Sequence, residues 1–536
     1  MKYSHIDIIE KCLYAYDKQR IADFISLVEK QGLTEHGFPR LAANIGTLMA
    51  EGRCLEYKDY FCRIMDLSCK WFPLVTDECD KAGNDFSIRE VCWALMKLEG
   101  KGIVDEVLIQ GWKTQIAALN PWQNYYKVVA DVETPDYNWA LFAAVSEYVR
   151  SSYCGIDNMD FVERQLANQL LAIDENGMYK DPHNPIMYDL VPRLLFMTLI
   201  IIGYDGIYRN TIEELLDKSS LLTLKMQSVT GEVPFGGRSI QFLQNEALMA
   251  SLCELYAVFY KKRGDIAKAG LFKAAAKLAV ENVCTYLNVE PVSHIKNRYP
   301  IDSLIGCEGY GYFNKYMITT ASNIYFAYRF CDDSIEPIYD NTSYVASTSA
   351  DFHKTFIRHG DYFLQYDTNA DLNYDANGLG RVHKKGCPSA ICLSVPFPKG
   401  EGYKIENPNS RAMSICLDDC AERPYKLVES NIDELGVHAR FENCIGSEMC
   451  HVSGNGVDIE FSKSGFMLPV YEFDGQNHTD ITILKDGIDV MYQGCTCSFK
   501  YDGVLSESFE YFNNRNGRYR VYKVAGNKLH VEISKG

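Results

Sequence analysis

The spacing of apolar residues changes once along this chain of 536 residues, and this change limits the folds open to it. Up to about residue 335, apolar side chains recur every three or four positions, as at Leu248, Leu252 and Leu255, which is the spacing of one face of an α-helix. After residue 341 they recur at every second position, as on one face of a β-strand. The sequence therefore predicts a helical domain followed by a sheet domain, an α+β fold class.

Two loops in the helical half are similar to each other. Residues 172–182 and 228–237 each separate two helical patterns, and each combines a glycine, a proline and an aromatic residue. They lie about 55 residues apart, and a period of about 50 residues with two helices per unit is typical of arrayed helical hairpins. About six hairpins fit into residues 1–335, so we expect an (α/α)6 toroid there. An open solenoid fits the same pattern.

Strand patterns fill the second half of the chain. Residues 457–461 and 488–492 alternate apolar with mostly polar side chains, and Asp486-Gly487 is a strong signal for a hairpin turn. These short alternating segments are typical of antiparallel sheets. We expect residues 341–536 to form an antiparallel β-sandwich domain.

Composition and charge exclude several classes of protein. The chain has 54 basic and 71 acidic residues, a net charge of −17 and no Lys/Arg-rich block, so we expect no nucleic-acid partner. The most apolar run, Leu194 to Ile202, is too short to span a bilayer, so we expect no membrane partner either. The acidic balance leaves an anionic substrate possible, because a few arginines in a pocket outweigh a distant surface charge. The oligomeric state stays open.

The N-terminal segment and the cysteines bear on the compartment. The first twenty residues read MKYSHIDIIEKCLYAYDKQR and contain no apolar core of signal-peptide length. Nineteen cysteines without such a signal favour free thiols in a reducing compartment over a disulfide framework. We therefore expect a cytoplasmic protein.

Several motifs of cofactor and metal chemistry are missing from the sequence. It contains no Walker-type loop, no His-Glu-x-x-His and no Gly-x-Ser-x-Gly. The segment Gly378 to Gly380 lacks the third glycine of a dinucleotide loop. Cys444, Cys450 and His451 do not have a conventional zinc spacing, so buried thiols are favoured. We expect neither a metal nor a cofactor.

The segment from Pro234 to Glu246 holds the densest group of polar residues and contains a pair of glycines, which let the backbone approach a ligand closely. Arg238 offers a bidentate clamp for a carboxylate. Gln241 and Asn245 are four residues apart, so we expect them on one face of the next helix as amide donors. The alternative is an arginine that caps a neighbouring helix.

A second segment, residues 307–316, carries three tyrosines close together in the sequence CEGYGYFNKY. Tyr310, Tyr312 and Tyr316 can line a sugar platform or donate protons. The chain has 36 tyrosines, so ordinary packing is the alternative for each of the three.

Two further clusters contain an arginine. Asp189 and Arg193 are four residues apart, near Pro192, which suits the first turn of a helix; an ion pair within that helix is favoured over a substrate contact. Arg381 and His383 are two apart, hence on one face of a strand. For this second pair, a solvent-facing position at a strand start is favoured over a functional one.

Together with a helical toroid, three segments resemble those of a polysaccharide-lyase family, the rhamnosyl-glucuronate lyases. The segments are PFGGRSIQFLQNEA, CEGYGYFNKY and YDANGLGRVH, and the resemblance extends from about residue 30 to about residue 530. It implies cleavage of the glycosidic bond to glucuronate by β-elimination, with release of the terminal rhamnose that caps plant gum and arabinogalactan side chains. Enzymes of this kind are often exported. The missing export signal therefore favours imported uronate-containing oligosaccharides as substrate.

The chemistry of such a lyase explains the residue types. The C5 proton next to the uronate carboxylate is very weakly acidic until that charge is neutralised, which Arg238 with Gln241 or Asn245 can do. A base then takes the C5 proton and an acid protonates the leaving O4. A tyrosine close to an arginine is expected to have its phenolate form favoured.

The resemblance and the chemistry assign roles to named residues, without settling which of them is base and which is acid. Arg238, Tyr310, Tyr316 and His383 are the expected catalytic residues. The expected substrate-binding residues are Gln241, Asn245, Glu246, Tyr312, Arg381, Asp189 and Arg193.

Two other functions fit the same sequence. A glycoside hydrolase needs two carboxylates that flank the scissile bond, and Glu246 with Glu308 or Asp189 are its candidates. A glycan-binding protein without catalysis is less favoured, because binding alone does not require a toroid of this size.

Overall fold

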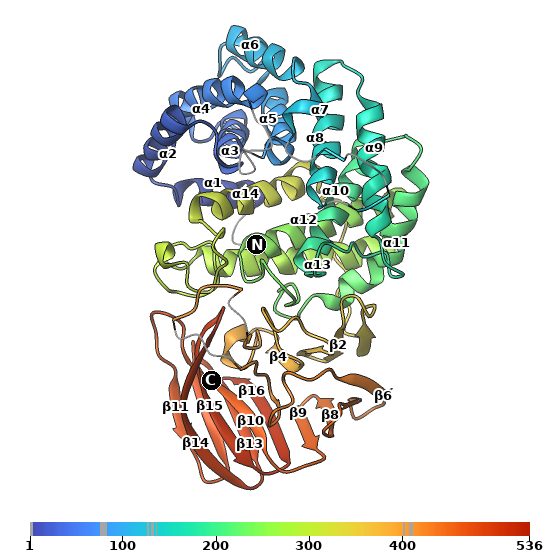
Figure 1. Ribbon diagram of the computed structural model, residues 1–536, viewed down its shortest axis with the longest axis vertical. Coiled ribbons are helices and arrows are strands. Elements are labelled where there is room, and N and C mark those ends of the chain that lie inside the picture. The colour runs from blue at the N-terminus through green and yellow to red at the C-terminus, as the bar shows by residue number, and fades with distance from the viewer. Residues whose placement is uncertain are drawn as a thin grey trace.

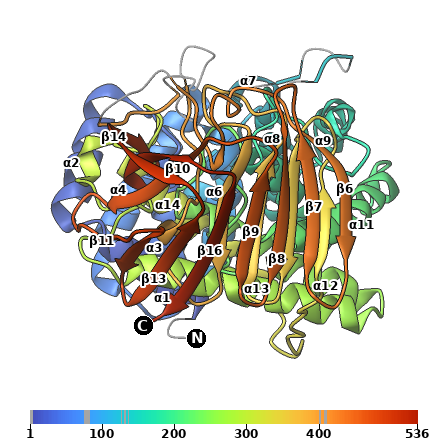
Figure 2. The same ribbon diagram turned by 90° about the horizontal axis from the view of Figure 1, so that it is seen from below.

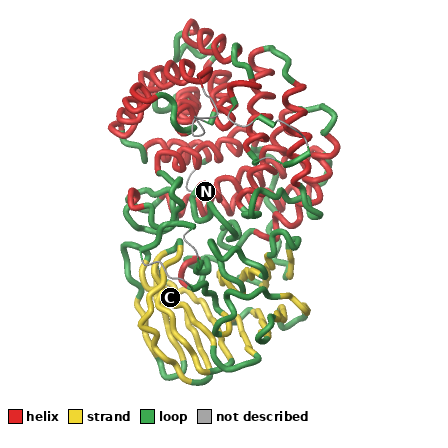
Figure 3. Tube along the Cα trace, in the orientation of Figure 1, coloured by secondary structure: helices red, strands yellow, loops and turns green. Residues whose placement is uncertain are grey.

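The computed structural model separates helices from strands along the chain, as Figures 1 and 3 show. Helix α14 (Phe313–Phe330) is the last helix and β1 (Tyr344–Ser347) the first strand, so the predicted domain boundary lies between them. The fold class predicted from the change of period is confirmed: a helical toroid is followed by antiparallel sheets. The described residues are 4–74, 83–125, 128–129, 133–135, 137–399, 402–406 and 411–536.

Six helices of the described chain form a closed inner ring. Each packs against the next in the series, and the last packs against the first, so the ring is a toroid and not an open solenoid. The inner helices are α3 (Gly37–Ala50), α5 (Asn84–Leu98), α8 (Trp139–Cys154), α10 (Met187–Ile202), α12 (Gln244–Lys262) and α14.

The outer helices cover the inner ring on its solvent side. Because each inner helix is covered in this way, it is buried on most of its surface; every residue of α3 is buried. The predicted stripe Leu248–Leu252–Leu255 lies in α12, and burial extends well beyond it, to both sides of that helix. The outer layer consists of α1 (His5–Tyr14), α2 (Lys18–Gln31), α4 (Lys58–Trp71), α6 (Glu106–Ala117), α9 (Met159–Gln169), α11 (Arg209–Met226) and α13 (Ile266–Leu287), with the short α7 (Pro121–Asn124).

In the described residues the strands form three antiparallel sheets. The largest has the order β11-β12-β13-β16-β9-β8-β7-β6, and Figure 2 shows most of its strands side by side beneath the helices. Its strands are β6 (Lys426–Ile432), β7 (Val437–Glu442), β8 (Ser447–Ser453), β9 (Gly456–Phe461), β11 (Asp480–Ile483), β12 (Gly487–Tyr492), β13 (Cys495–Tyr501) and β16 (Lys528–Lys535).

Two smaller sheets pack on the inner face of the large one. Their orders are β1-β2-β3-β4 and β14-β15-β10-β5. Stacking of Tyr366 on Phe441, with ring centroids 3.9 Å apart, joins the first small sheet to the large one, and Phe461 on Phe466 joins the second. The remaining strands are β2 (Lys354–His359), β3 (Tyr362–Asp367), β4 (Gly378–Lys384), β5 (Cys416–Leu417), β10 (Phe466–Phe473), β14 (Val504–Asn514) and β15 (Gly517–Ala525).

The alternation of apolar and polar residues predicted for the sheet half is confirmed at residues 457–461. Val457, Ile459 and Phe461 of β9 are buried, whereas Asp458 and Glu460 between them are exposed. The Asp486-Gly487 turn joins the paired strands β11 and β12. The sandwich is therefore built from one-sided strands, as the period of two predicts.

The sheet β1-β2-β3-β4 differs, because both of its faces are covered. Phe356 and Phe363 belong to the hydrophobic core of the helical ring, whereas Ile357 and Leu364, their neighbours along the strands, belong to the core of the sandwich. This sheet is therefore a layer between the toroid and the large sheet, and it fixes one against the other.

No helix in the described part of the chain is both long and apolar enough to cross a membrane.

A buried carboxyl group in the sandwich predicts a pH-dependent stability. Burial raises the pKa of Glu448 on β8 to about 8. Native protein thus keeps a proton that the unfolded chain loses near pH 4.5, so stability falls by about 1.4 kcal/mol per pH unit between about pH 4.5 and pH 8. Glu448→Gln should lack this loss, so its melting temperature should rise relative to wild type between pH 5 and pH 8. If the melting temperatures of the variant and the wild type differ by the same amount at pH 5 and at pH 8, the prediction is wrong.

Candidate active site

A cavity of about 1190 Å³ occupies the bore of the helical ring. All six inner helices contribute side chains to its wall, from Arg40 on α3 to Lys315 on α14, and loops at 181–183 and 309–312 form part of its rim. A cavity of this size and position is a typical ligand site of an α-helical toroid. It also brings together four of the predicted residues, Arg238, Tyr310, Tyr312 and Tyr316.

The wall of this cavity carries an excess of positive charge. Among the described residues it includes Arg40, Arg89, Arg238 and Lys315, against the carboxylates Glu35 and Asp181. The chain as a whole has a net charge of −17, so this concentration of cations is local. Such a wall attracts an anionic ligand into the bore.

Two of the arginines share one buried carboxylate. Arg40 Nε donates to Glu90 at 3.0 and 3.1 Å, and Arg89 Nη2 donates to Glu90 Oε1 at 3.1 Å. Burial lowers the pKa of Arg89 to about 10, and its Nε atom has no hydrogen-bond partner among the described residues. Burial raises the pKa of Asp85, the other carboxyl group near Arg89, to about 7. Glu90 alone cannot neutralise two guanidinium groups, so this side of the bore keeps a net positive charge at and below neutral pH.

His36 lies beside this pair and is uncharged. Burial, with Lys315, Arg40 and Arg89 nearby, lowers its pKa well below the usual value. Arg40 Nη1 lies 3.2 Å from Nδ1, and because an arginine only donates, Nδ1 is the acceptor and the ring proton sits on Nε2. His36 stacks on Phe86 with ring centroids 4.5 Å apart, which fixes the plane of the imidazole.

Arg238 lies on the cavity wall at the other side of the rim. Its Nη1 donates to the Pro182 carbonyl at 2.6 Å, its Nη2 pairs with Asp181, and the guanidinium lies 4.8 Å from the ring centroid of Tyr188. Burial raises the pKa of Asp181 in spite of the arginine. Arg238 thus lines the bore and holds two loops together. It does not cap a neighbouring helix, because both of its partners lie in the loop before α10.

The residue after Arg238 joins two tyrosine hydroxyls. Ser239 Oγ lies 3.0 Å from the Tyr188 hydroxyl and 2.7 Å from the Tyr310 hydroxyl. Ser239 has a φ of +64°, which is rare for a residue with a side chain. Its N–H donates to Glu308 Oε1 at 2.6 Å and its carbonyl accepts from Asn245 Nδ2 at 3.0 Å, which holds this conformation.

The tyrosines of the bore are protonated. Burial raises the pKa of Tyr188, Tyr310 and Tyr316 above the usual value, and the neighbouring phenols and Glu308 add to the shift for Tyr310. The expectation of a favoured phenolate is therefore wrong, because the loss of hydration outweighs the attraction of Arg238. Tyr316 also stacks on Phe242 at 4.4 Å between centroids, and Tyr312 is 51% exposed at the rim.

The two predicted amide donors do not share a helical face. Helix α12 begins at Gln244, so Gln241 precedes it, and Gln241 has a left-handed φ of +66°. Asn245 is in the helix but donates to the Ser239 carbonyl. Neither side chain lines the bore, so the prediction that both flank Arg238 on one face is wrong. The left-handed turns at Ser239 and Gln241 reverse the chain before the helix starts.

The carboxylates considered for hydrolysis also lie outside the bore. Glu246 is buried and accepts from Lys296 Nζ at 2.6 Å, and Glu308 holds the Ser239 N–H. Asp189 pairs with Arg193 at 2.5 Å, both fully buried, which is the ion pair expected within a helix.

The position predicted for Pro192 is wrong. Helix α10 begins at Met187, five residues earlier, so Pro192 lies inside the helix and Asp189 in its first turn. The Tyr179 N–H donates to Asp189 Oδ1 at 2.9 Å, which ties the preceding loop to this turn.

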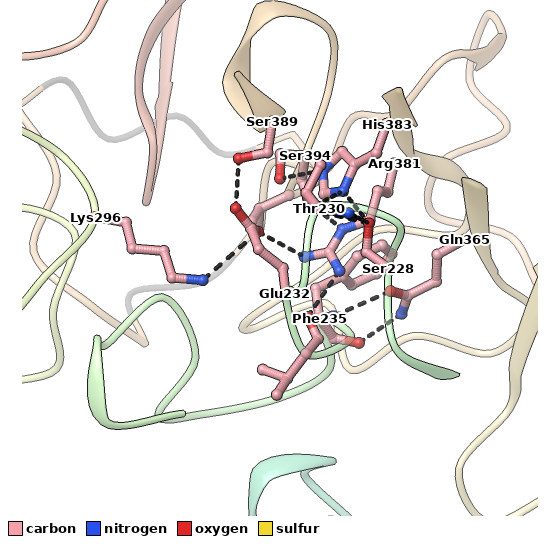
Figure 4. Close-up of polar contacts among 12 residues, drawn as sticks. Ser228, Thr230, Glu232, Phe235, Lys296, Gln365, Arg381, His383, Ser389 and Ser394 are labelled. Carbon is pink, nitrogen blue, oxygen red and sulfur yellow. Dashed lines mark hydrogen bonds and ion pairs between the residues drawn. The ribbon is translucent and has the colours of Figure 1, made fainter. Parts of the chain in front are cut away.

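Arg381 and His383 lie on one face of β4, as predicted, but they are buried and not solvent-facing (Figure 4). His383 Nδ1 lies 2.7 Å from Ser228 Oγ and Nε2 lies 2.8 Å from Ser394 Oγ. Burial, with Arg381 nearby, lowers the pKa of His383 well below its usual value. His383 therefore faces the back of the 228–237 loop and not the mouth of the toroid.

Arg381 holds the same loop. Its Nη1 donates to the Val233 carbonyl at 2.7 Å, and Glu232 lies 3.7 Å away as an ion-pair partner (Figure 4). Neither Arg381 nor His383 is part of the wall of the bore.

A second cavity, of about 530 Å³, lies between α13 and the sheets. Its wall includes Glu232, Lys296 and Ser389, and Ser389 donates to Glu232 at 2.5 Å. The tyrosine and Arg238 clusters lie at the bore and not at this cavity, so we place the candidate site in the bore.

The residues considered as zinc ligands do not converge. Cys450 and His451 are consecutive on β8 and so point to opposite faces, and Cys444 is exposed in the turn before it. No group of three potential metal ligands occurs among the residues that the structure describes.

Sequence reasoning missed the wall residues His36, Arg40, Arg89, Tyr188 and Lys315, and also Ser239, which bonds to two tyrosines of the wall. His36 and Arg40 are four residues apart, which is a usable signal for one helical face, but they are about 200 residues from Arg238. Tyr188 and Ser239 lie directly beside residues that were singled out, Asp189 and Arg238. Only the closing of the ring and the turn at Ser239 bring these groups together.

No family model and no curated protein sequence matches this chain. Solved structures do. A heparan sulfate lyase from Pedobacter heparinus is 9% identical with a TM-score of 0.47, over 93% of this chain and 75% of that one. A chondroitin AC lyase from Streptomyces coelicolor A3 is 9% identical with a TM-score of 0.45, over 99% and 83%. A β-L-arabinofuranosidase from Geobacillus stearothermophilus is 9% identical with a TM-score of 0.40, over 98% and 95%.

These similarities include both lyases and a glycoside hydrolase. With TM-scores below 0.5 they do not bear on the activity of this chain, which has to be inferred from the bore itself.

Proposed function

We propose that this chain is a lyase that cleaves the glycosidic bond to a uronate in an oligosaccharide by β-elimination. One observation carries the proposal: the wall of one cavity carries four cationic side chains together with protonated tyrosines, two of which are joined through Ser239. The favoured substrate is a rhamnosyl-glucuronate oligosaccharide, from which elimination releases the terminal rhamnose. No cofactor enters the reaction.

The cations serve the first half of the reaction. Removing the C5 proton leaves negative charge on the carboxylate and the adjacent carbon. Arg238, or the pair Arg40 and Arg89, neutralises that charge at the wall of the bore. Fixed donors of this kind contribute about 3–4 kcal/mol each to the stabilisation of such an intermediate.

The uncharged groups serve the proton transfers. Tyr310 is protonated and can give its proton to the leaving O4, and Ser239 and Tyr188 can relay a proton back to it. His36 is neutral, and a carboxylate that takes over the Arg40 Nη1 donor frees Nδ1 to accept the C5 proton. One proton leaves C5 and one arrives at O4, so no other reactant is needed.

The bore gives less support to a hydrolase. Hydrolysis requires two carboxylates that flank the scissile bond. Glu246, Glu308 and Asp189 all lie outside the wall of the bore, and of the two carboxylates that belong to its wall, Asp181 is bound to Arg238.

Product absorbance tests the proposal. Elimination leaves a C4–C5 double bond that is conjugated to the carboxylate, and this conjugated product absorbs in the ultraviolet. Hydrolysis forms no such double bond, so its products do not show this absorbance. The purified chain should increase ultraviolet absorbance with at least one member of a panel of uronate oligosaccharides that includes rhamnosyl-glucuronate. Release of reducing sugar without ultraviolet absorbance would show that the chain is a hydrolase and not a lyase. If no member of the panel reacts, both the lyase and the hydrolase proposals are rejected.

Activity should survive chelation. The proposed neutralisation uses arginines, so prolonged treatment with EDTA should leave turnover within about twofold of the untreated enzyme. A loss that one divalent ion restores would instead place the carboxylate on a metal.

The pH dependence of kcat/KM should be broad. Activity requires His36 unprotonated and Tyr310 protonated; the pKa of His36 is lowered and that of Tyr310 is raised. The acid limb should therefore fall below pH 6.5 and the alkaline limb above pH 10. If kcat/KM instead follows a bell-shaped pH profile centred near pH 7, with both limbs between pH 6.5 and pH 10, groups other than His36 and Tyr310 carry the proton transfers.

A further inference from the structure

Buried side chains of the sheet half bind peptide groups of Val233, Phe235 and Gly237, in the loop that leads to Arg238. We infer that Asp375, Gln365 and Arg515 are positioning residues: they fix Arg238 at the wall of the bore, and Ser239 against the wall residues Tyr188 and Tyr310, without lining the bore themselves. This inference rests on the proposed function of the bore, and it adds a role for the sheet half in that function.

Gln365 on β3 binds both the N–H and the carbonyl of Phe235, as Figure 4 shows. Its Oε1 accepts from the Phe235 N–H at 3.1 Å and its Nε2 donates to the Phe235 carbonyl at 2.6 Å. Both groups of one residue are thus fixed by one amide. With Arg381 on the Val233 carbonyl, the sheet layer next to the toroid holds the first part of the loop.

Gly237, directly before Arg238, is held in the same way. Its N–H donates to Asp375 Oδ2 at 2.6 Å and its carbonyl accepts from Arg515 Nη2 at 3.0 Å. The position has a φ of +73°, and a Cβ there would lie 2.7 Å from the Pro185 Cβ, so only glycine fits. The two contacts fix the direction in which the chain leaves toward Arg238.

Arg515 reaches this position because a hairpin tip is buried. Residues 513–516 connect β14 to β15 and are almost completely buried, although hairpin tips normally lie in solvent. The Arg515 guanidinium lies 4.4 Å from the ring centroid of Tyr403, and Asn297 Nδ2 donates to the Arg515 carbonyl at 3.0 Å. The tip is therefore anchored from the toroid side as well.

The contacts matter because Ser239 needs support. Its left-handed φ is unfavourable by roughly 1–2 kcal/mol for a residue with a Cβ, and such a conformation persists only where the surroundings enforce it. Its hydroxyl must also stay within reach of Tyr188 and Tyr310. Displacements of about 1 Å in a catalytic constellation can lower the rate about 100-fold.

Asp375 gives the sharpest test, because one substitution removes its hydrogen bond to the Gly237 N–H and another keeps it. Asp375→Ala removes the acceptor of the Gly237 N–H, whereas Asp375→Asn keeps an acceptor oxygen and removes only the charge. Asp474→Ala is the control for the loss of a buried carboxylate away from this loop. Asp474 is as buried as Asp375 and also binds backbone N–H groups, those of Gln476 and Asn477. It additionally accepts from the Tyr492 hydroxyl at 2.7 Å and pairs with Arg298 at 3.2 Å, so its removal is at least as disruptive to the fold. Measurements are made at pH 8, because burial raises the pKa of Asp375 to about 6.

Two readouts are combined. One is kcat and KM in the ultraviolet assay. The other is the ¹⁹F resonance of 3-fluorotyrosine introduced at position 310, which reports the surroundings of that hydroxyl without any turnover. The second readout remains valid if the lyase assay finds no substrate, so failure of the proposed function and failure of the positioning role are distinguishable.

We expect Asp375→Ala to lower kcat about 10- to 100-fold with KM within about threefold, and to shift the ¹⁹F resonance. Asp375→Asn and Asp474→Ala should stay within about threefold in kcat and keep the wild-type resonance. The inference is overturned if Asp375→Ala matches Asp474→Ala in both readouts. Equal defects in Asp375→Asn, or a loss of kcat without a change in resonance, would overturn it as well.

Discussion

Arg238→Ala should lower kcat/KM on a uronate oligosaccharide by about two to three orders of magnitude, the effect of removing about 3–4 kcal/mol of transition-state stabilisation. Arg238 lies on the wall of the bore directly before Ser239. Arg238→Lys keeps the charge but loses the forked pair of donors, so its turnover should be impaired and not only its affinity. The measurement is steady-state kinetics by ultraviolet absorbance.

The pairing of Arg238 with Asp181 requires a second variant. Removing the arginine leaves a buried carboxylate without its cation, which can destabilise the loop at 181–183. The double variant Arg238→Ala with Asp181→Asn removes that penalty. It should melt close to wild type and remain as inactive as the single variant. Near-normal turnover in a folded Arg238→Ala enzyme would exclude the residue from the mechanism, and recovery in the double variant would reduce its role to holding the loop.

Tyr310→Phe should lower kcat by about 100- to 10,000-fold with little change in KM, because it removes the acid that protonates O4. Burial keeps the Tyr310 hydroxyl protonated, and Ser239 connects it to Tyr188. Tyr188→Phe removes the last hydroxyl of the Tyr310–Ser239–Tyr188 relay but keeps Tyr310 as the acid, so its kcat should fall less than that of Tyr310→Phe.

The control for this prediction is Tyr256→Phe. Tyr256 is a fully buried tyrosine of α12 whose hydroxyl donates to the Leu216 carbonyl, outside the bore. The same hydroxyl lies 3.1 Å from Ser219 Oγ, so its removal should lower the melting temperature without changing kcat. If Tyr310→Phe and Tyr256→Phe were equally active, the acid would have to be found elsewhere on the wall.

The sequence by itself determined the elements and their order. The change of apolar period near residue 335 separates helices from strands, and the alternation at 457–461 matches the buried and exposed positions of β9. These features were predictable because each depends on residues close together along the chain. Arg238, Tyr310 and Tyr316 were also accessible as candidate residues, because each lies in a short segment rich in polar groups.

Tertiary structure alone decided which of those groups share a cavity. Closing the ring places α14 against α3, which brings His36 and Arg40 to the same bore as Arg238, and no local pattern records that closure. The left-handed conformations of Ser239 and Gln241 separate their side chains: the Ser239 hydroxyl binds two tyrosines of the bore, whereas Gln241 is no part of the wall.

The same limit applies to the sheet half. Arg381 and His383 share a strand face, as the period of two predicts, but the period does not say what covers that face. A loop of the toroid, residues 228–237, covers this face of β4. Arg381 and His383 therefore bind that loop, although the sequence predicted that they face solvent. Burial and charge pairing arise from contacts between segments far apart in sequence, and these contacts decide whether a polar side chain faces a ligand, a partner or a peptide group.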